Sequence, residues 1–301
     1  MTEKINLTFL GTSQAIPTAK RNHTSILLQY KAENILVDCG EGTQRQFRKA
    51  KLNPCKITRI LITHWHGDHI LGLAGLLQTL LLNGYNKTLY IYGPRGTKND
   101  LQDLINLLVP YNKIPLKVQE IEEGKFFENS DFYLEAIPMQ HSIPCNAYAF
   151  VEKSKIRLDK TKLRKLKIPN SPLIGELQAG KDIEFKGKKI KAKDLIYKTE
   201  ERKISFILDT RLNENCNRIA KNSDIIITEA VYLNNELDLA NLHEHLTAEQ
   251  AGEIAKKAGA KKLYLSHLSQ RYDGNEKLIL NEAKKKFKNT IIAEDLMHIE
   301  I

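Results

Sequence analysis

The segment THWHGDH, residues 63–69, places three imidazoles and one carboxylate within six residues. His64 and His66 are two residues apart at the end of an apolar run, so in extended backbone their side chains point the same way. Asp68 and His69 follow after a glycine, which lets the loop turn. The pattern therefore offers two imidazoles to one point and a carboxylate with an imidazole to a neighbouring point.

This geometry is typical of a site for two metal ions. Nitrogen and oxygen ligands favour zinc, with manganese or iron as the next choices. A single histidine near a strand end is more often a surface or core residue. Three histidines and an aspartate within six residues, between an apolar strand and an apolar helix, are much better explained by metal binding.

Three further groups stand in equivalent places. His141 follows the apolar run YLEAIPMQ, Asp209 ends ISFILD, and His267 ends KLYLSH. Each of them alone is as readily a structural residue, but side chains at the ends of strands can converge in a crevice at the edge of a sheet. We therefore expect them to complete the site. Asp38, which ends NILVD, is predicted to support the histidine loop rather than to be a ligand.

The elements that must position these groups alternate along the chain. Short apolar runs bounded by glycine or charged turns predict strands at residues 5–11, 24–30, 34–38, 57–63, 88–93, 203–209, 223–230 and 262–267. Leucine- and alanine-rich runs predict helices at 70–82, 98–108 and 248–258. Thr247 and Gln250 form the capping box that begins the last of these helices. Strands and helices mixed in this way indicate a layered α/β protein.

The amino-acid composition limits the cellular locations that we expect for the protein. The 301 residues are 42% hydrophobic and include no apolar run of about 18 residues, so we expect no membrane span. The first residues carry an acid and no long apolar stretch, which is not typical of a secretory signal. Four scattered cysteines, without a CxxC pair, favour reduced thiols and a cytoplasmic location.

Residues 153–198 differ from the rest of the chain. They hold 15 Lys or Arg against 5 Asp or Glu, and this excess of +10 equals the net charge of the whole chain. The apolar runs there are weak and a turn-rich centre, IPNSPLIGELQAG, interrupts them. One interpretation is a solvated surface insertion without a partner. The other is an arm that binds phosphates, because neutralising several phosphates releases counterions and gives affinity independent of sequence.

Several segments together identify a family. The chain resembles the metallo-β-lactamase superfamily, and within it the ribonuclease Z family of tRNA 3′-processing endonucleases, in FLGTSQAIPTAKRNHTS, LVDCGEGTQRQF, THWHGDH, PLIGELQAG, ILDTR, TEAVY, HLTAEQA and SHLSQRY. The resemblance implies an αββα sandwich that spans residues 1–301 as a single domain, with 153–198 as an inserted tRNA-binding arm. It also implies a homodimer.

The resemblance assigns roles to nine residues. Two zinc ions per subunit would be held by His64, His66 and His141 and by Asp68, His69 and His267, with Asp209 bridging them. Asp68 would also accept a proton, and Glu229 with His245 would help to protonate the leaving oxygen. The implied reaction removes the 3′ trailer from precursor tRNA and leaves a 3′-hydroxyl on the tRNA and a 5′-phosphate on the trailer.

The chain departs from the family pattern at a few positions. The loop P-x-K-x-R-N appears as residues 17–22, with Ala19 where lysine is expected and Lys20 one place later. In relatives, that loop serves discrimination against tRNA that already ends in CCA. TEAV replaces HEAT, HLT replaces HST, and Ser171 precedes Pro172 where relatives have glycine. All the ligand and catalytic positions are retained.

Two other functions remain open at this point. A small-molecule metallo-hydrolase of the same superfamily, such as a phosphodiesterase or thioesterase, would use the same ligands but would not need a segment of net charge +10. A nucleic-acid-binding protein with an inactive site predicts a missing ligand, whereas all seven are present. His23, His243 and His298 are interpreted as structural or surface residues, and Trp65 as packing beside the site.

Overall fold

The computed structural model describes residues 3–301, which form two compact units. The larger unit contains residues 3–127, 134–150 and 203–301, and the smaller unit contains residues 128–133 and 151–202. The expected site residues all belong to the larger unit.

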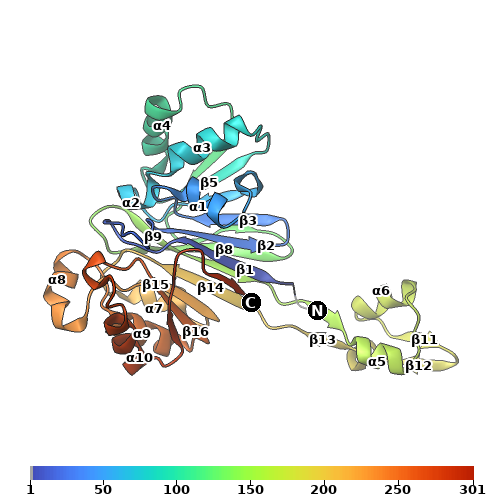
Figure 1. The fold of residues 1–301 in the computed structure, drawn as a ribbon. Helices are drawn as coiled ribbons and strands as arrows, with labels where there is room; N and C mark the ends of the chain where they lie inside the picture. Colours follow the sequence, from blue (N-terminus) through green and yellow to red (C-terminus); the bar gives the residue numbers. More distant parts are fainter. Residues whose placement is uncertain (1–2) are drawn as a thin grey trace. The chain divides into compact units, whose positions relative to one another are not determined.

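The first sheet of the larger unit combines antiparallel and parallel strands (Figure 1). Its strand order is β18 (His298–Glu300), β1 (Ile5–Gly11), β2 (Ser25–Tyr30), β3 (Glu33–Val37), β4 (Arg59–Leu61), β5 (Leu89–Gly93) and β6 (Leu116–Glu120). β3 to β6 are parallel, so their connections must cross over the sheet. These crossovers carry α1 (Thr43–Lys49), α2 (Gly67–Ile70), α3 (Leu73–Leu82) and α4 (Thr97–Leu108).

The second sheet also contains a run of parallel strands. Its order is β17 (Thr290–Ile292), β16 (Lys262–Ser266), β15 (Ile225–Glu229), β14 (Arg202–Ile207), β9 (Cys145–Glu152), β8 (Phe132–Met139) and β7 (Gly124–Glu128). β14 to β17 are parallel. The helices that accompany this sheet are α7 (Glu214–Ala220), α8 (Leu237–Leu242), α9 (Ala248–Ala258) and α10 (Lys277–Lys286). Thr247 and Gln250 form the capping box at the start of α9, as the sequence predicts.

The two sheets pack face to face between helical layers. The Tyr148 hydroxyl of β9 donates to the carbonyl oxygen of Ile62 at 2.8 Å, across the interface between the sheets. On the outer face of the first sheet, α3 buries Leu73, Leu76 and Leu80, while α9 and α10 cover the second sheet. The predicted αββα sandwich is therefore confirmed.

The helix predicted over residues 70–82 is interrupted. α2 ends at Ile70 and α3 begins at Leu73, because backbone from the end of β3 enters the gap. The amide of Cys39 donates to the His69 carbonyl at 2.7 Å, and the amide of Gly72 donates to the Cys39 carbonyl at 2.9 Å. A Cβ atom on Gly72 would lie 2.0 Å from the carbonyl oxygen of Gly40. Glycine at position 72 thus lets two backbone segments meet directly behind the histidine loop.

The smaller unit has an apolar core of its own. It contains the strand pair β10 (Ile156–Leu158) and β13 (Ile196–Lys198), the pair β11 (Ile183–Phe185) and β12 (Lys188–Ile190), and the helices α5 (Lys160–Lys165) and α6 (Pro172–Gln178). The buried residues of this core are Leu163, Ile168, Leu177, Ile183, Ala192 and Leu195. The turn-rich centre predicted from the sequence is in fact mostly α6, which begins with proline, where the missing amide hydrogen costs nothing.

Within residues 3–301, no helix combines the length and the apolar character that spanning a bilayer requires.

Candidate active site

The expected site residues come from strand ends of both sheets. The histidine loop follows β4, and Asp38 follows the neighbouring strand β3. On the second sheet, Asp209 follows β14 and His267 follows β16. Because β14, β15 and β16 are parallel, their carboxyl ends lie at one edge of the sheet, where ligand sites of α/β folds usually form. His141 joins them from the loop after β8.

Three imidazoles form the first group of possible ligands. His64 Nε2 lies 3.0 Å from His66 Nδ1, and His141 Nε2 lies 3.1 Å from the same atom. Their nitrogens are close enough to share one ion. His141 lies more than seventy residues further along the chain, yet its ring centroid is 5.0 Å from that of His64. The structure thus brings together the first predicted ligand set.

The second group consists of two imidazoles and a carboxylate. His69 Nε2 and His267 Nε2 are 3.1 Å apart. Asp68 Oδ2 lies 3.2 Å from His267 Nε2 and 3.3 Å from His69 Nε2. These atoms, with Asp209, lie close enough to one another to bind a second ion.

Asp209 lies between the two groups. Its Oδ1 is 3.3 Å from His69 Nε2 and 3.1 Å from His267 Nε2, in the second group. Its Oδ2 is 3.7 Å from His64 Nε2 and 4.0 Å from His141 Nε2, in the first. Oδ1 is buried and accepts no hydrogen bond within residues 3–301. A buried carboxylate oxygen without a donor is costly, and a cation between the two groups would satisfy it. The donor set therefore fits two metal ions.

Burial and neighbouring charges both shift the pKa values of these groups. Burial lowers the pKa of His64 well below its ordinary value, and the neighbouring His69 adds to this effect. Burial also acts to lower the pKa of His69, but Asp209, Asp38 and Asp68 outweigh it and raise that pKa well above the ordinary value. The carboxyl of Asp209 has its pKa lowered despite burial, because His267 and His69 favour its charged form. A fixed positive charge in the cluster would stabilise these carboxylates in the same way.

Asp38 supports the histidine loop through hydrogen bonds. Its Oδ1 accepts the Thr63 amide at 2.7 Å, and its Oδ2 accepts the Thr63 hydroxyl at 2.8 Å and His69 Nδ1 at 2.7 Å. With Nδ1 donating to Asp38, His69 presents Nε2 to the cluster. Asp38 has a φ of 57°, a conformation that L-residues seldom adopt. This arrangement is the supporting role expected from the sequence.

Replacing Asp38 with alanine is expected to weaken the binding of a divalent metal ion, tested with zinc, by about 10- to 100-fold, because His69 loses the acceptor that fixes its orientation. The measurement is zinc content and affinity in a titration with a competing chelator. The matched control is Asp224→Ala, which removes a buried aspartate whose Oδ2 accepts the Lys203 amide. If Asp38→Ala and Asp224→Ala hold zinc equally well, Asp38 does not position the ligand.

Glu229 and His245 are paired beside the cluster. His245 Nδ1 lies 3.1 Å from both carboxylate oxygens of Glu229, and Glu229 is fully buried. Its Oε1 also accepts the Thr210 amide at 2.8 Å. Burial acts to lower the pKa of His245, but Glu229 outweighs it and raises the pKa to about 9. His245 is thus held as an imidazolium at the edge of the site.

A cavity of about 560 Å³ opens over the cluster. It is lined by ligand residues and by His245, and also by residues for which no role in the site was predicted, namely Gln14, Tyr232, Leu242 and His243. His243 is exposed there, as a surface interpretation implies. His23 is buried with Nε2 3.1 Å from the Ala15 carbonyl, and the Trp65 indole donates to Thr97 Oγ1 at 2.9 Å. Both are structural residues in this arrangement.

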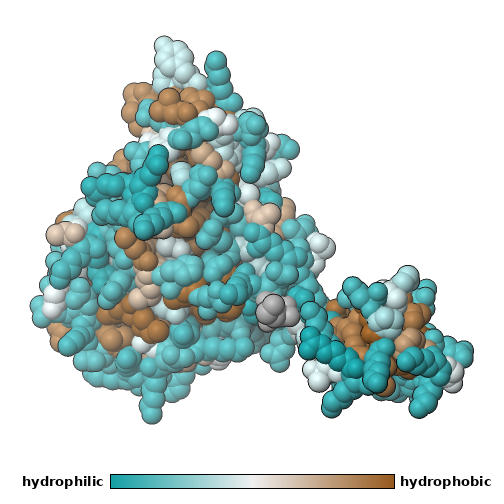
Figure 2. Space-filling model, turned by 45° about the vertical axis from the view of Figure 1, so that its right-hand side comes forward, coloured by the Kyte–Doolittle hydropathy of each residue, from teal (hydrophilic) through white to brown (hydrophobic). Residues whose placement is uncertain are grey.

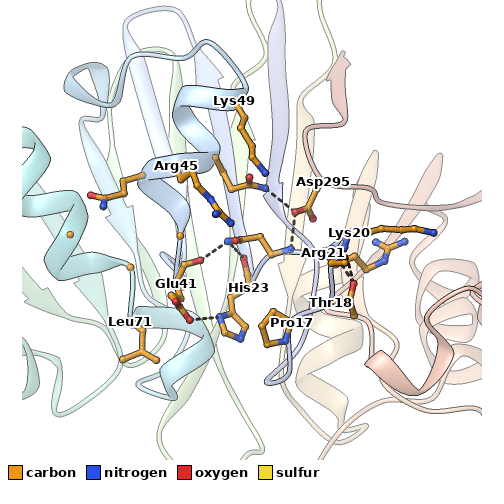
Figure 3. Close-up of a pocket in the computed structure, with 17 residues that line it drawn as sticks. Pro17, Thr18, Lys20, Arg21, His23, Glu41, Arg45, Lys49, Leu71 and Asp295 are labelled. Atoms are coloured by element: carbon orange, nitrogen blue, oxygen red, sulfur yellow. Dashed lines mark hydrogen bonds and ion pairs between the residues drawn. The ribbon is translucent and has the colours of Figure 1, made fainter.

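A second cavity, of about 520 Å³, adjoins the loop of residues 17–23 (Figure 3). Arg45 and Lys49 reach it from α1, and Lys20 from the loop. Arg21 is buried and fixes the loop, since its Nη1 donates to Thr12 Oγ1 at 2.8 Å and to the Ala293 carbonyl at 2.7 Å. The lysine displaced by one position relative to the family pattern therefore still lines this basic cavity.

Relatives of known name match the chain from end to end. It is 36% identical to ribonuclease Z of Bacillus velezensis over 305 residues, covering 99% of each chain. It is 39% identical to ribonuclease Z of Nanoarchaeum equitans over 291 residues, covering 97% of this chain and 92% of the relative. Residues 5–161 match the family model described as Anti-Pycsar protein Apyc1, about half of the chain.

Solved structures give the same result. The short form of human tRNase Z superposes with a TM-score of 0.72 at 27% identity and 98% coverage of both chains. The metallo-β-lactamase fold protein YhfI of Bacillus subtilis superposes with a TM-score of 0.73 at 19% identity over the full length of both chains, a likeness of fold. From the full-length identity to named relatives, the chain belongs to the ribonuclease Z family.

Proposed function

We propose that this protein is a zinc-dependent endoribonuclease that removes the 3′ trailer from precursor tRNA, leaving a tRNA 3′-hydroxyl and a trailer 5′-phosphate. The observation that supports this proposal most strongly is that all seven candidate ligand residues, from both sheets, lie in one cluster, in a chain similar over its whole length to ribonuclease Z. The enzyme is a hydrolase, and its family acts on phosphodiesters of RNA.

The cluster would hold two zinc ions, one at His64, His66 and His141 and one at Asp68, His69 and His267, with Asp209 between them. Two such ions lower the pKa of water and stabilise the entering and leaving oxygens of an in-line displacement. Asp68 lines the cavity with part of its side chain open to it, so it is placed to take the proton of the attacking water. The surrounding imidazoles keep the pKa of its carboxyl low and the group charged, although burial opposes this.

His245 would supply the proton to the leaving oxygen. His245→Ala is expected to lower kcat on precursor tRNA by about 100-fold or more, the range of general acid catalysis. The loss should be much smaller on bis(p-nitrophenyl) phosphate, because nitrophenolate leaves without a proton. His298→Ala, which removes an exposed histidine of β18, is the control. Equal losses on both substrates would show that His245 is not the acid.

A homodimer would fit an exposed apolar patch on the larger unit. Leu82, Leu107 and Tyr111 have 86%, 78% and 83% of their surface exposed, far more than such side chains usually show. The end of α3 lies beside the end of α4, since Gln78 Nε2 donates to the Leu108 carbonyl at 3.0 Å. Figure 2 shows apolar surface at the top of the larger unit, where α4 lies in Figure 1.

Leu107→Lys is expected to convert the dimer into a monomer in light scattering, because it places a charge on the apolar patch. Asn99→Lys, an exposed change on the first turns of the same helix, should leave the dimer intact. A wild-type protein that is monomeric at micromolar concentration would refute the dimer.

We also propose a cytoplasmic location, because all four cysteines are free, as is usual where thiols stay reduced.

The decisive experiment incubates zinc-loaded protein with a precursor tRNA that carries a 3′ trailer and maps the ends of the products. Cleavage next to the discriminator base, with the end groups given above, supports the proposal. A small phosphodiester or thioester turned over rapidly, with the precursor left intact, would favour the small-molecule hydrolase instead.

A further inference from the structure

The cavity over the cluster contains an aromatic stack that the chemistry described above does not use. The ring of His243 lies parallel to the ring of Tyr232, with centroids 6.3 Å apart and planes at 11°. The guanidinium carbon of Arg271 lies 5.5 Å from the Tyr232 centroid. Arg271 is itself held by Glu236, with Nη1 to Oε1 at 3.1 Å. Three planar groups are thus arrayed beside the active site.

The stack has a buried side and an open side. Tyr232 is 6% exposed, so it is a fixed support. His243 is exposed and lines the cavity next to Leu242, which is 72% exposed. No other aromatic ring or cation lies against His243 within residues 3–301. Proteins use exposed aromatic and apolar side chains to stack unpaired bases.

The backbone fixes this open ring relative to the reaction. Glu244 has a φ of 57°, and this sharp turn lets both His243 and His245 line the same cavity. The Tyr232 ring lies 6.2 Å from the His245 ring, so one aromatic ring connects the stacking position to the proposed acid. The Glu244 carbonyl oxygen is also 3.4 Å from Nδ1 of the ligand His141. A base on His243 would therefore be a neighbour of the bond that is cut.

We propose that His243, supported by Tyr232 and Arg271, is a stacking site for the unpaired nucleobase that flanks the scissile phosphate. This inference rests on the proposed function, and it adds a position that recognises a base without reading its identity, since every base has a stacking face. The base belongs either to the nucleotide before the cut or to the first nucleotide of the trailer.

The test is a double-mutant cycle between enzyme and substrate. His243→Ala is expected to lower kcat/KM on precursor tRNA by about 5- to 150-fold, the range for loss of one stacked base. His243→Phe, which keeps a stacking ring, should restore most of that loss. Two further precursors carry an abasic residue, one immediately before the cut and the other immediately after it. The wild-type enzyme should cleave one of these two precursors more slowly than the intact precursor. That same abasic precursor should be cleaved equally by wild type and His243→Ala.

The outcomes separate the two proposals. If wild type does not cleave the intact precursor, the proposed function fails. If wild type cleaves it but His243→Ala acts equally well, or loses the same factor on both abasic precursors as on the intact one, the stacking site is wrong while the function stands. The exposed control His298→Ala should behave as wild type throughout.

Discussion

Asp209→Ala is expected to reduce hydrolysis of precursor tRNA and of bis(p-nitrophenyl) phosphate to the background of the assay. One oxygen of Asp209 faces the second ligand group at 3.1 and 3.3 Å, and the other faces the first group at 3.7 and 4.0 Å. Its loss would leave crowded imidazoles without the carboxylate that is proposed to bridge two ions. The zinc content, measured by mass spectrometry of the metal, should fall from the proposed two ions per subunit to one or fewer.

A more conservative variant distinguishes the loss of the Asp209 charge from the loss of its side-chain volume. Asp209→Asn keeps the shape of the side chain but removes its charge, so it should lose zinc almost as completely, whereas Asp224→Asn should keep both ions and full activity. Asp224 is a buried aspartate like Asp209, but its Oδ1 pairs with Lys261 at 2.6 Å. Two tightly held zinc ions in Asp209→Ala would disprove the bridging role.

Removal of most of the smaller unit is expected to abolish productive tRNA binding without harming the cluster. Leu158 and Ile196 are cross-strand partners in the β10–β13 ladder, so residues 159–195 can be replaced by an Asn-Gly turn, which suits a two-residue hairpin. The deletion removes 11 Lys or Arg and 5 Asp or Glu. For every phosphate that the protein no longer neutralises, the salt slope of the binding constant falls by about 0.7 to 0.9. The measurement is kcat/KM and binding at several salt concentrations.

The control for charge is a variant with Lys284 and Lys285 of α10 replaced by glutamine, since both are exposed lysines of the larger unit. It should keep most of its salt dependence. Turnover of bis(p-nitrophenyl) phosphate should persist in the deletion variant, because all seven ligand residues remain. If the deletion affects the small substrate and the tRNA equally, the smaller unit serves the fold rather than the tRNA.

The sequence predicted the site better than its surroundings. His64, His141, Asp209 and His267 were found because each follows an apolar run, and the ends of such runs meet at one edge of a sheet. The break in the helix at Gly72 was missed, since its cause is a backbone contact with Gly40, far away in the sequence. The hydrophobic pattern within one segment cannot reveal a contact with a segment that is distant in the sequence.

The same limit applies to the smaller unit and to the cavity wall. Lysine-rich composition concealed a small core, because Leu163, Leu177 and Leu195 are spaced without a clear period and meet only after folding. The sequence contained no indication of a stacking role for His243, because that role depends on the parallel ring of Tyr232 beside it in the fold. Net charge, by contrast, can be counted directly from the sequence, and it distinguished residues 153–198 from the rest of the chain.

The smaller unit has a consequence for how such enzymes diversify. It carries its own core, and at its base Arg202 Nε meets Glu152 Oε2 at 2.5 Å, so the chain leaves close to where it entered. A segment with adjacent ends and independent packing can be lengthened, shortened or exchanged by recombination while the candidate ligand residues keep their places. Under the proposed function, selection could then change which RNA is bound and how the bond is broken as two separate traits.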